Sequence, residues 1–208
     1  MSDIEEKQRV LDIAAGKFLE SGFNKVTIDE VATELRMSKK TLYKFFPSKE
    51  DLIHAVAKLL LSNAEREVSA IVNAEEPFEQ KVTKLLTLIG KNMHRISRQF
   101  QLDIQRYAPN LWKEIETFRR EKIFVRVRQM FEQAKRENIF REDLNVDLLY
   151  LVFIHTVQGI MNPKTLSENS FSAVEAFQGI VKIIYEGALT EEGRKRVNLF
   201  RTDINQQL

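Results

Sequence analysis

The chain has 208 residues, and its 32 Lys or Arg against 30 Asp or Glu leave a formal net charge of only +2. It contains no cysteine, which excludes a disulfide framework and any thiolate metal site. Its length suits one small domain and one larger domain. The first 30 residues are acidic and amphipathic, and no uncharged apolar run reaches about 18 residues. We therefore expect a soluble, cytoplasmic protein that does not enter the membrane.

Apolar residues recur at intervals of three and four along the whole chain, and only 7 glycines and 4 prolines interrupt it. This spacing predicts an all-α fold. The first helix is expected to end at Gly22, a typical residue just beyond a helix C-terminus. Its buried stripe is expected to contain Val10, Leu11, Ala14, Ala15, Phe18 and Leu19.

Three helix starts follow within residues 27–51. Thr27 and Glu30 have the spacing of a capping box, in which each side chain bonds the other residue's backbone N–H. Ser38 is placed to cap a second helix, and Ser48 with Asp51 a third. Because the first two helices are separated by a very short linker, the pattern predicts a helix-turn-helix.

The second of these helices begins with Lys39 and Lys40, although the positive end of a helix dipole disfavours cations. Residues 36–49 contain five basic side chains and no acidic one. If this helix end faces DNA, phosphates and guanine edges attract lysine and the unfavourable effect reverses. A charge run on a helix is also commonly a solvated face. The capped spacing of the three helices favours DNA binding.

Residues 27–51, with Gly22-Phe23 before them and TLYKFFPSKE at their end, resemble the DNA-binding domain of the tetracycline-repressor (TetR) family of bacterial regulators. The resemblance covers about the first 60 residues and implies a recognition helix near residues 38–45. It implies DNA contacts from the following residues. They are Thr27, Arg36, Ser38, Lys39, Lys40, Thr41, Tyr43, Lys44 and Lys49.

Two positions depart from the family pattern. Arg36 stands where the family usually has a turn glycine, so a non-glycine residue is expected in a turn that favours positive φ. Lys40 stands where the family usually has a small residue or proline, which adds charge and changes the expected operator contacts.

Beyond the motif, a fourth helix is expected from Ser48 toward residue 72, with a boundary at Glu75-Glu76-Pro77. A fifth helix is predicted over residues 82–96 and a short one near 99–107. Pro109 suits the first turn of a long helix that runs to about residue 137.

Residues 146–161 and 171–185 are apolar on nearly all sides, and residues 162–170 are expected to join them as a loop. Either both segments form the core of a monomer, or one face of each meets a second copy. The TetR resemblance implies the second arrangement, a four-helix bundle between two copies. The interface is expected to contain Leu148, Leu151, Val152, His155, Phe177, Ile180, Val181 and Ile184. The tail after Thr190 is expected to be a polar helical end.

A ligand cavity is the second site that the sequence suggests, although aromatic and Met side chains at helical spacing are more often core. The candidate lining is Met93, His94, Phe100, Tyr107, Trp112 and Phe118. The other histidines, His54 and His155, lie far from His94 in sequence. We expect all three to be ordinary packed or surface residues, with no metal and no cofactor.

The sequence thus predicts a helix-turn-helix DNA-binding domain over residues 1–50 and a helical regulatory and dimerisation domain over 51–208. We expect a repressor that binds a palindromic double-stranded DNA operator as a homodimer and is released by an unidentified, largely apolar small-molecule effector. The alternative is a DNA-bound protein whose C-terminal domain docks a protein partner. An enzyme is disfavoured because the chain lacks a nucleophile elbow, a phosphate loop and a zinc-protease motif.

Overall fold

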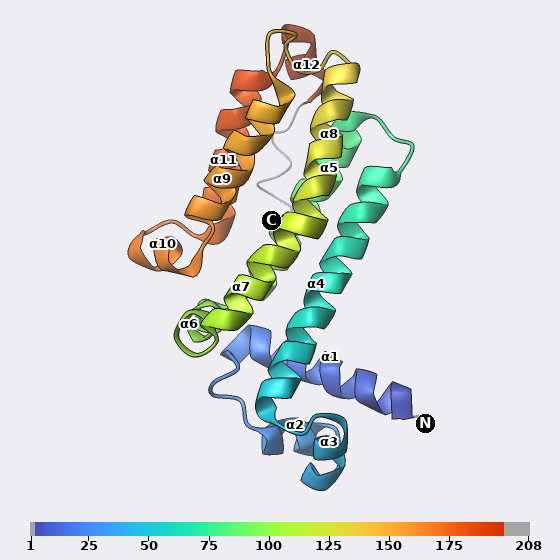
Figure 1. The fold of residues 1–208 in the computed structure, drawn as a ribbon, viewed down its shortest axis with the longest axis vertical. Helices are drawn as coiled ribbons and strands as arrows, with labels where there is room; N and C mark the ends of the chain where they lie inside the picture. Colours follow the sequence, from blue (N-terminus) through green and yellow to red (C-terminus); the bar gives the residue numbers. More distant parts are fainter. Residues whose placement is uncertain (1–2, 198–208) are drawn as a thin grey trace. The chain divides into compact units, whose positions relative to one another are not determined.

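The computed structural model describes residues 3–197, and within that range it is built from helices, as the sequence predicts (Figure 1). No strand occurs among the described residues, where Phe140 and Leu189 form an isolated β-bridge. The helices form two compact units, each with its own apolar core. None of the described helices is long and apolar enough to cross a membrane.

The first unit combines the described residues up to Ala64 with Arg95–Arg119. The second combines Glu65–His94 with the described residues from Arg120 onward. The sequence placed a domain boundary after residue 50, whereas the first compact unit extends further along the chain and also takes in a later segment.

The first unit contains five helices and the beginning of a sixth. They are α1 (Asp3–Ser21), α2 (Ile28–Glu34), α3 (Lys39–Phe45), α6 (Arg98–Tyr107), α7 (Pro109–Phe118) and the first part of α4 (Lys49–Asn73). Helix α1 ends as predicted: Gly22 follows it with φ +80°, and the Gly22 N–H donates to the Phe18 carbonyl at 2.9 Å.

Helix α6 is attached to α1 and to the segment that leaves it. The Ser97 N–H donates to the Leu19 carbonyl at 2.9 Å, just ahead of α6. Asp103 is fully buried, and its carboxylate accepts the Asn24 N–H at 2.7 Å and the Gln99 side-chain amide at 2.8 Å. A buried carboxylate needs such donors. Asp103 therefore fixes the α1–α2 connection against α6.

The second unit contains the end of α4 and the remaining helices, apart from their terminal residues Arg95 and Arg119, which belong to the first unit. They are α5 (Phe78–Arg95), the π-helical segment η1 (Arg119–Ile123), α8 (Phe124–Arg136), α9 (Val146–Ile160), α10 (Pro163–Glu168), α11 (Ala173–Ala188) and α12 (Glu191–Arg196). Its core is aromatic: Phe140 lies edge-on to Phe131, Phe78 and Tyr185, with ring centroids 5.4, 5.8 and 5.9 Å apart.

Two predicted elements differ from the structure. The long helix expected from Pro109 to about residue 137 is interrupted by η1. Ile115 and Phe124 are nine residues apart, about two and a half turns, so an uninterrupted α-helix would place them on opposite faces. Ile115 belongs to the core of the first unit and Phe124 to the core of the second. The π-helical segment η1 therefore lies at the point where the helix stops burying one face and begins to bury another.

The loop expected over residues 162–170 is also wrong in part, because it contains α10. Asn162 caps this helix by accepting the Thr165 N–H at 2.9 Å. The polar helical end predicted after Thr190 is confirmed as α12 over Glu191–Arg196, and its continuation past residue 197 lies outside the described residues.

Candidate nucleic-acid interface

The helix-turn-helix begins with the predicted capping box. The Glu30 N–H donates to Thr27 Oγ1 at 3.2 Å, and the Thr27 N–H donates to the Glu30 carboxylate at 2.6 Å. The Thr27 backbone bond lowers the pKa of Glu30. Ser38 caps α3 in the same way, because the Thr41 N–H donates to its Oγ at 3.0 Å. The backbone of α2 and α3 is thus fixed at both helix starts.

The turn between α2 and α3 has the backbone geometry that the sequence predicts. Arg36 adopts φ +55°, a left-handed conformation that glycine tolerates better than arginine. The Met37 N–H donates to the Ala32 carbonyl at 3.0 Å and closes the end of α2. Arg36 is exposed, so its side chain leaves the turn toward solvent.

Helix α3 has one anchored face and one free face. Leu42 is fully buried and Phe46, just after the helix, is 3% exposed, so these two residues hold α3 against the core. Lys40, Tyr43 and Lys44 are exposed and lie away from that core. The free face is therefore basic and aromatic, and no described ion pair or hydrogen bond engages its two lysine side chains.

Lys39 has a partner that the sequence did not reveal. Its Nζ lies 2.8 Å from the Asp29 carboxylate on α2, and this hydrogen bond raises the pKa of Lys39. Although residues 36–49 contain no acid, the preceding helix supplies one. The charge of Lys39 is thus already neutralised in part within the chain.

Lys49, in the first turn of α4, is tied to the α1–α2 connection. Its Nζ donates to the Asn24 carbonyl at 3.1 Å, and the N–H of the same Asn24 donates to Asp103. Burial lowers the pKa of Lys49, while the charges of Asp103 and Glu30 oppose that shift. Asn24 therefore links a predicted phosphate contact to the buried carboxylate of α6.

A hollow of about 370 Å³ lies beside Lys49 within the first unit. Asn24, His54 and Tyr107 contribute polar groups to it, and Ile53 and Leu111 line it with apolar atoms. Tyr107 is 57% exposed.

The six residues predicted for a ligand cavity are divided between the units. Phe100, Trp112, Tyr107 and Phe118 belong to the first unit, where Phe100 and Trp112 pack against the core. Met93 and His94 belong to the second, where Met93 packs against the core and His94 is exposed.

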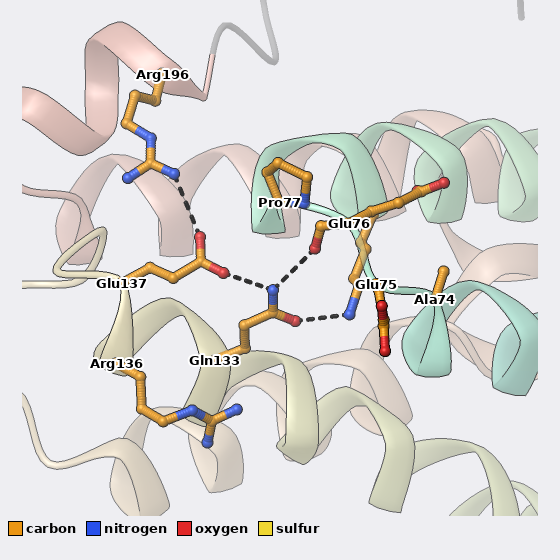
Figure 2. A pocket seen from close by; sticks show the side chains of 9 residues that line it. Ala74, Glu75, Glu76, Pro77, Gln133, Arg136, Glu137 and Arg196 are labelled. Carbon is orange, nitrogen blue, oxygen red and sulfur yellow. Dashed lines mark hydrogen bonds and ion pairs between the residues drawn. The ribbon is translucent and has the colours of Figure 1, made fainter.

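A shallow polar groove of about 660 Å³ in the second unit is shown in Figure 2. Gln133 lies at its centre, donating to the Glu76 carbonyl at 3.1 Å and to Glu137 at 2.6 Å. Arg196 pairs with Glu137 at 3.3 Å, and the buried Lys81 donates to Gln133 at 2.9 Å. The polar side chains of this groove thus bond to one another. Their contacts connect α12 to the end of α8 and to the segment just before α5.

The residues predicted for a dimer interface fall into two groups. On α9, Leu148, Leu151 and Val152 are 60, 48 and 47% exposed, and His155 is also exposed. The four residues predicted on α11 are instead buried in the core of their own unit. Phe177, Ile180, Val181 and Ile184 are 8, 4, 2 and 9% exposed.

The outward side of α11 carries a different apolar residue, Ile183, which is 75% exposed. Sequence reasoning did not include Ile183 among the predicted interface residues. It also passed over Asp29 and Asp103, whose partners lie 10 and 79 residues away in the chain.

The three histidines lie on three different helices, α4, α5 and α9. His54 Nδ1 is 3.5 Å from Glu114, and His94 and His155 are exposed. Within residues 3–197, no group of three or more His, Cys, Asp or Glu side chains has an arrangement that could hold a metal ion.

Comparison with known proteins agrees with this geometry. Residues 10–56 match the family model described as bacterial regulatory proteins of the tetR family. The HTH-type transcriptional regulator YvaF of Bacillus subtilis (strain 168) is 22% identical over 174 residues, which cover 83% of this chain and 90% of YvaF.

Solved structures show the same fold along most of the chain. The fatty acid degradation regulator FadR of Bacillus halodurans superimposes with a TM-score of 0.64 at 14% identity, covering 90% of this chain and 98% of FadR. A transcriptional regulator of Saccharomonospora viridis, solved in complex with choline, gives 0.67 at 16% identity, covering 91% and 100%. Residues 10–56, with the capped α2–α3 pair, thus match the DNA-binding domain of the tetR family of bacterial regulatory proteins, and the chain shares the fold of these solved regulators along most of its length.

Proposed function

We propose that the protein is a dimeric repressor that inserts α3 into the major groove of a palindromic operator. The observation that carries this proposal is the free face of α3, where Lys40, Tyr43 and Lys44 are exposed while Leu42 is fully buried. Lysine binds guanine edges and phosphates, and a helix of this kind fits the major groove. Lys39 joins this face once DNA replaces Asp29.

The flanking helix starts serve a different role in the proposal. Thr27 and Lys49 lie at the first turns of α2 and α4, where backbone N–H groups and a cation suit a phosphate. Arg36 lies in the turn before α3, Ser38 caps α3 and Thr41 lies in its first turn, and the three are assigned to backbone or base contacts.

Dimerisation is supported by the outward side of α9 and α11. Leu148, Leu151, Val152 and Ile183 leave large apolar surfaces in solvent on two neighbouring helices. Burial of such a surface stabilises an isologous dimer. A two-fold dimer presents two α3 helices to half-sites spaced by about one helical turn of DNA.

The second unit and the α6–α7 segment are assigned to effector response. The transcriptional regulator solved with choline supports the idea that this fold accommodates a small molecule. An effector can release operator only through its different affinity for the DNA-bound and free states, typically about 1 to 3 kcal/mol.

The test begins with selection of an operator from random DNA by the purified full chain. Lys39→Ala/Lys40→Ala should lower affinity for the selected operator by roughly 10- to 100-fold, because base-reading lysines are lost. Lys58→Ala/Lys113→Ala is the charge-matched control, since both lysines are exposed and lie outside α3. Equal operator affinity of the two double variants, with unchanged circular dichroism, would show that α3 is not the recognition helix.

A further inference from the structure

Asp103 is a fully buried acid on α6, and each of its two carboxylate oxygens accepts a hydrogen bond from an uncharged donor. Oδ2 accepts the Asn24 backbone N–H at 2.7 Å, and Oδ1 accepts the Gln99 side-chain amide at 2.8 Å. Burial of a charge without a directly paired cation is costly. An asparagine here could accept the Asn24 N–H through its own oxygen and bond a rotated Gln99 amide. The hydrogen bonds alone therefore do not require an acid at this position.

The end of α1 passes very close to this carboxylate. A Cβ at Gly22 would lie 2.5 Å from Asp103 Oδ2, so only glycine fits against it, and the φ of +80° at Gly22 also favours glycine. Two residues later the Asn24 N–H donates to the same oxygen. The path of the chain between α1 and α2 is thus built around Asp103.

The carbonyl of Asn24 carries this arrangement on to α4. Lys49 Nζ donates to that carbonyl at 3.1 Å, and in the described part of the chain it is the one hydrogen-bond acceptor of this ammonium group. An ammonium group has three donors, so two remain available. Lys49 also borders the hollow of about 370 Å³, which leaves space beside it. Lys49 is therefore oriented by one bond and can still bind an anion.

The charge of Asp103 supports Lys49 in a second way. Burial lowers the pKa of Lys49, and the negative charge of Asp103 opposes that shift. Asp103 thus favours the charged form of Lys49, which is the form that binds a phosphate. Because the oxygens of Asp103 are bonded to Asn24 and Gln99, Asp103 does not take the ammonium group away from an incoming phosphate.

We propose that Asp103 is a positioning residue for DNA binding: it holds Asn24 so that the Asn24 carbonyl places the Lys49 ammonium group against an operator phosphate. Asp103 is itself fully buried on α6, so it acts only through Asn24 and Lys49. This inference rests on the proposed DNA-binding function and adds to it a residue outside the helix-turn-helix.

The first test is a double-mutant cycle. Asp103→Asn keeps the shape of the side chain and removes its charge, and Lys49→Met removes the phosphate contact. Asp103→Asn alone should weaken binding to the selected operator and to a scrambled duplex by the same factor, about 3- to 10-fold. The slope of log affinity against log salt should fall in magnitude. In the Lys49→Met background, Asp103→Asn should change affinity by less than about 2-fold, because the contact that it positions is already absent.

Asp12→Asn on α1 is the matched control. Asp12 also accepts the side-chain amide of the glutamine four residues before it, Gln8, at 2.8 Å, but it is exposed. This variant should bind DNA as wild type does. If Asp103→Asn weakens binding equally with and without Lys49, leaves the salt slope or the affinity unchanged, or tightens binding, the proposal is wrong. Loss of the folded state in Asp103→Asn, seen by circular dichroism, would make Asp103 a structural residue and would equally overturn it.

The second test needs no DNA. Nitrogen NMR of lysine ammonium groups should show more restricted motion for Lys49 than for Lys58, which is exposed on the same helix. Lys49→Met assigns the Lys49 signal. In Asp103→Asn, the motion of Lys49 should approach that of Lys58. Equal motion of the two lysines in the wild-type protein would show that Asn24 does not orient Lys49, whether or not Asp103→Asn folds, and would overturn the proposal.

The two tests separate failure of this inference from failure of the proposed function. A protein that selects an operator but gives an additive cycle keeps its proposed function and loses only the role of Asp103. A protein that selects no DNA sequence loses the proposed repressor function, and with it the phosphate contact, even if NMR shows that Asp103 orders Lys49.

Discussion

Lys39 and Asp29 form an ion pair across the helix-turn-helix, with 2.8 Å between Nζ and the carboxylate oxygen. Both side chains are largely exposed, so the pair is weak and is screened by salt. In the proposed complex with DNA, this pair competes with the operator for Lys39. An operator that contacts Lys39 must displace Asp29 and bring phosphates near that carboxylate.

Replacing Asp29 with asparagine should therefore raise operator affinity. The variant removes an internal competitor for Lys39 and a negative charge near DNA, and we expect roughly 2- to 10-fold tighter binding at 150 mM salt. Fluorescence anisotropy with the selected operator measures this change.

Asp147→Asn is the matched control for that substitution. Asp147 is paired with Arg128 at 2.6 Å, and its side chain is 68% exposed against 66% for Asp29, but it lies in the second unit. Its operator affinity should equal that of wild type. Weaker binding by Asp29→Asn would mean that Asp29 positions Lys39 for DNA instead of competing for it.

Lys49 should contribute affinity without sequence preference. Lys49→Met retains the apolar stem at this partly buried position and removes the charge. Binding to the selected operator and to a scrambled duplex should weaken by the same factor. The slope of log affinity against log salt should fall in magnitude by about 1. Lys58→Met, further along α4, should leave the slope unchanged, and loss restricted to the operator would assign Lys49 to base recognition.

Gly22 should be essential for the junction between α1 and α6. A Cβ at this position would lie 2.5 Å from an Asp103 carboxylate oxygen, and φ is +80°. Gly22→Ala should destabilise the protein by at least about 2 kcal/mol, because the left-handed conformation and the clash add. Urea unfolding measures the change. Gly16→Ala, inside α1 with nothing within 4 Å, should instead stabilise by about 0.5 to 1 kcal/mol.

Replacing Arg36 should make the protein more stable while weakening its binding to DNA. Its φ of +55° favours glycine, so Arg36→Gly should stabilise the protein by about 0.5 to 1 kcal/mol. If Arg36 also contacts a phosphate, the same variant should bind all DNA sequences more weakly. Thermal unfolding and anisotropy measure the two effects separately, and a lower melting temperature would refute the proposed backbone strain.

The parts of the molecule that depend on neighbours in sequence were predictable. Capping boxes and helix ends join residues three or four positions apart, so Thr27, Ser38 and Gly22 identified the helix boundaries correctly. The Asn24–Asp103 contact joins residues 79 positions apart. No local pattern contains that information, because burial of Asp103 depends on where α6 packs.

The side of α11 that faces solvent also depends on packing. The exposed Glu175, Lys182 and Glu186 mark one polar side of α11, but they do not identify which apolar residues beside it reach solvent. Packing decided that Ile184 lies in the core while its neighbour Ile183 is 75% exposed. Side chains of the same type, adjacent in the chain, thus have opposite environments, and hydrophobicity alone cannot distinguish them.

The proposed dimer can be tested with two valines of nearly equal exposure in the same unit. Val152 on α9 is 47% exposed and lies on the proposed interface, whereas Val125 on α8 is 45% exposed and lies outside it. Val152→Glu would bury one charge from each subunit near a two-fold axis, where neither has a partner. We expect the dimer dissociation constant to rise roughly 100-fold or more, with operator binding lost in parallel because two half-sites must be held together.

Val125→Glu should leave both properties unchanged. Sedimentation velocity at micromolar concentration measures assembly, and circular dichroism verifies that each variant is folded. A monomeric wild-type chain, or equal dissociation constants for the two variants, would remove α9 from the interface. The exposed surface of Leu148, Leu151 and Val152 on α9 would then be assigned to a partner other than a second copy, since an apolar surface of this kind still favours burial.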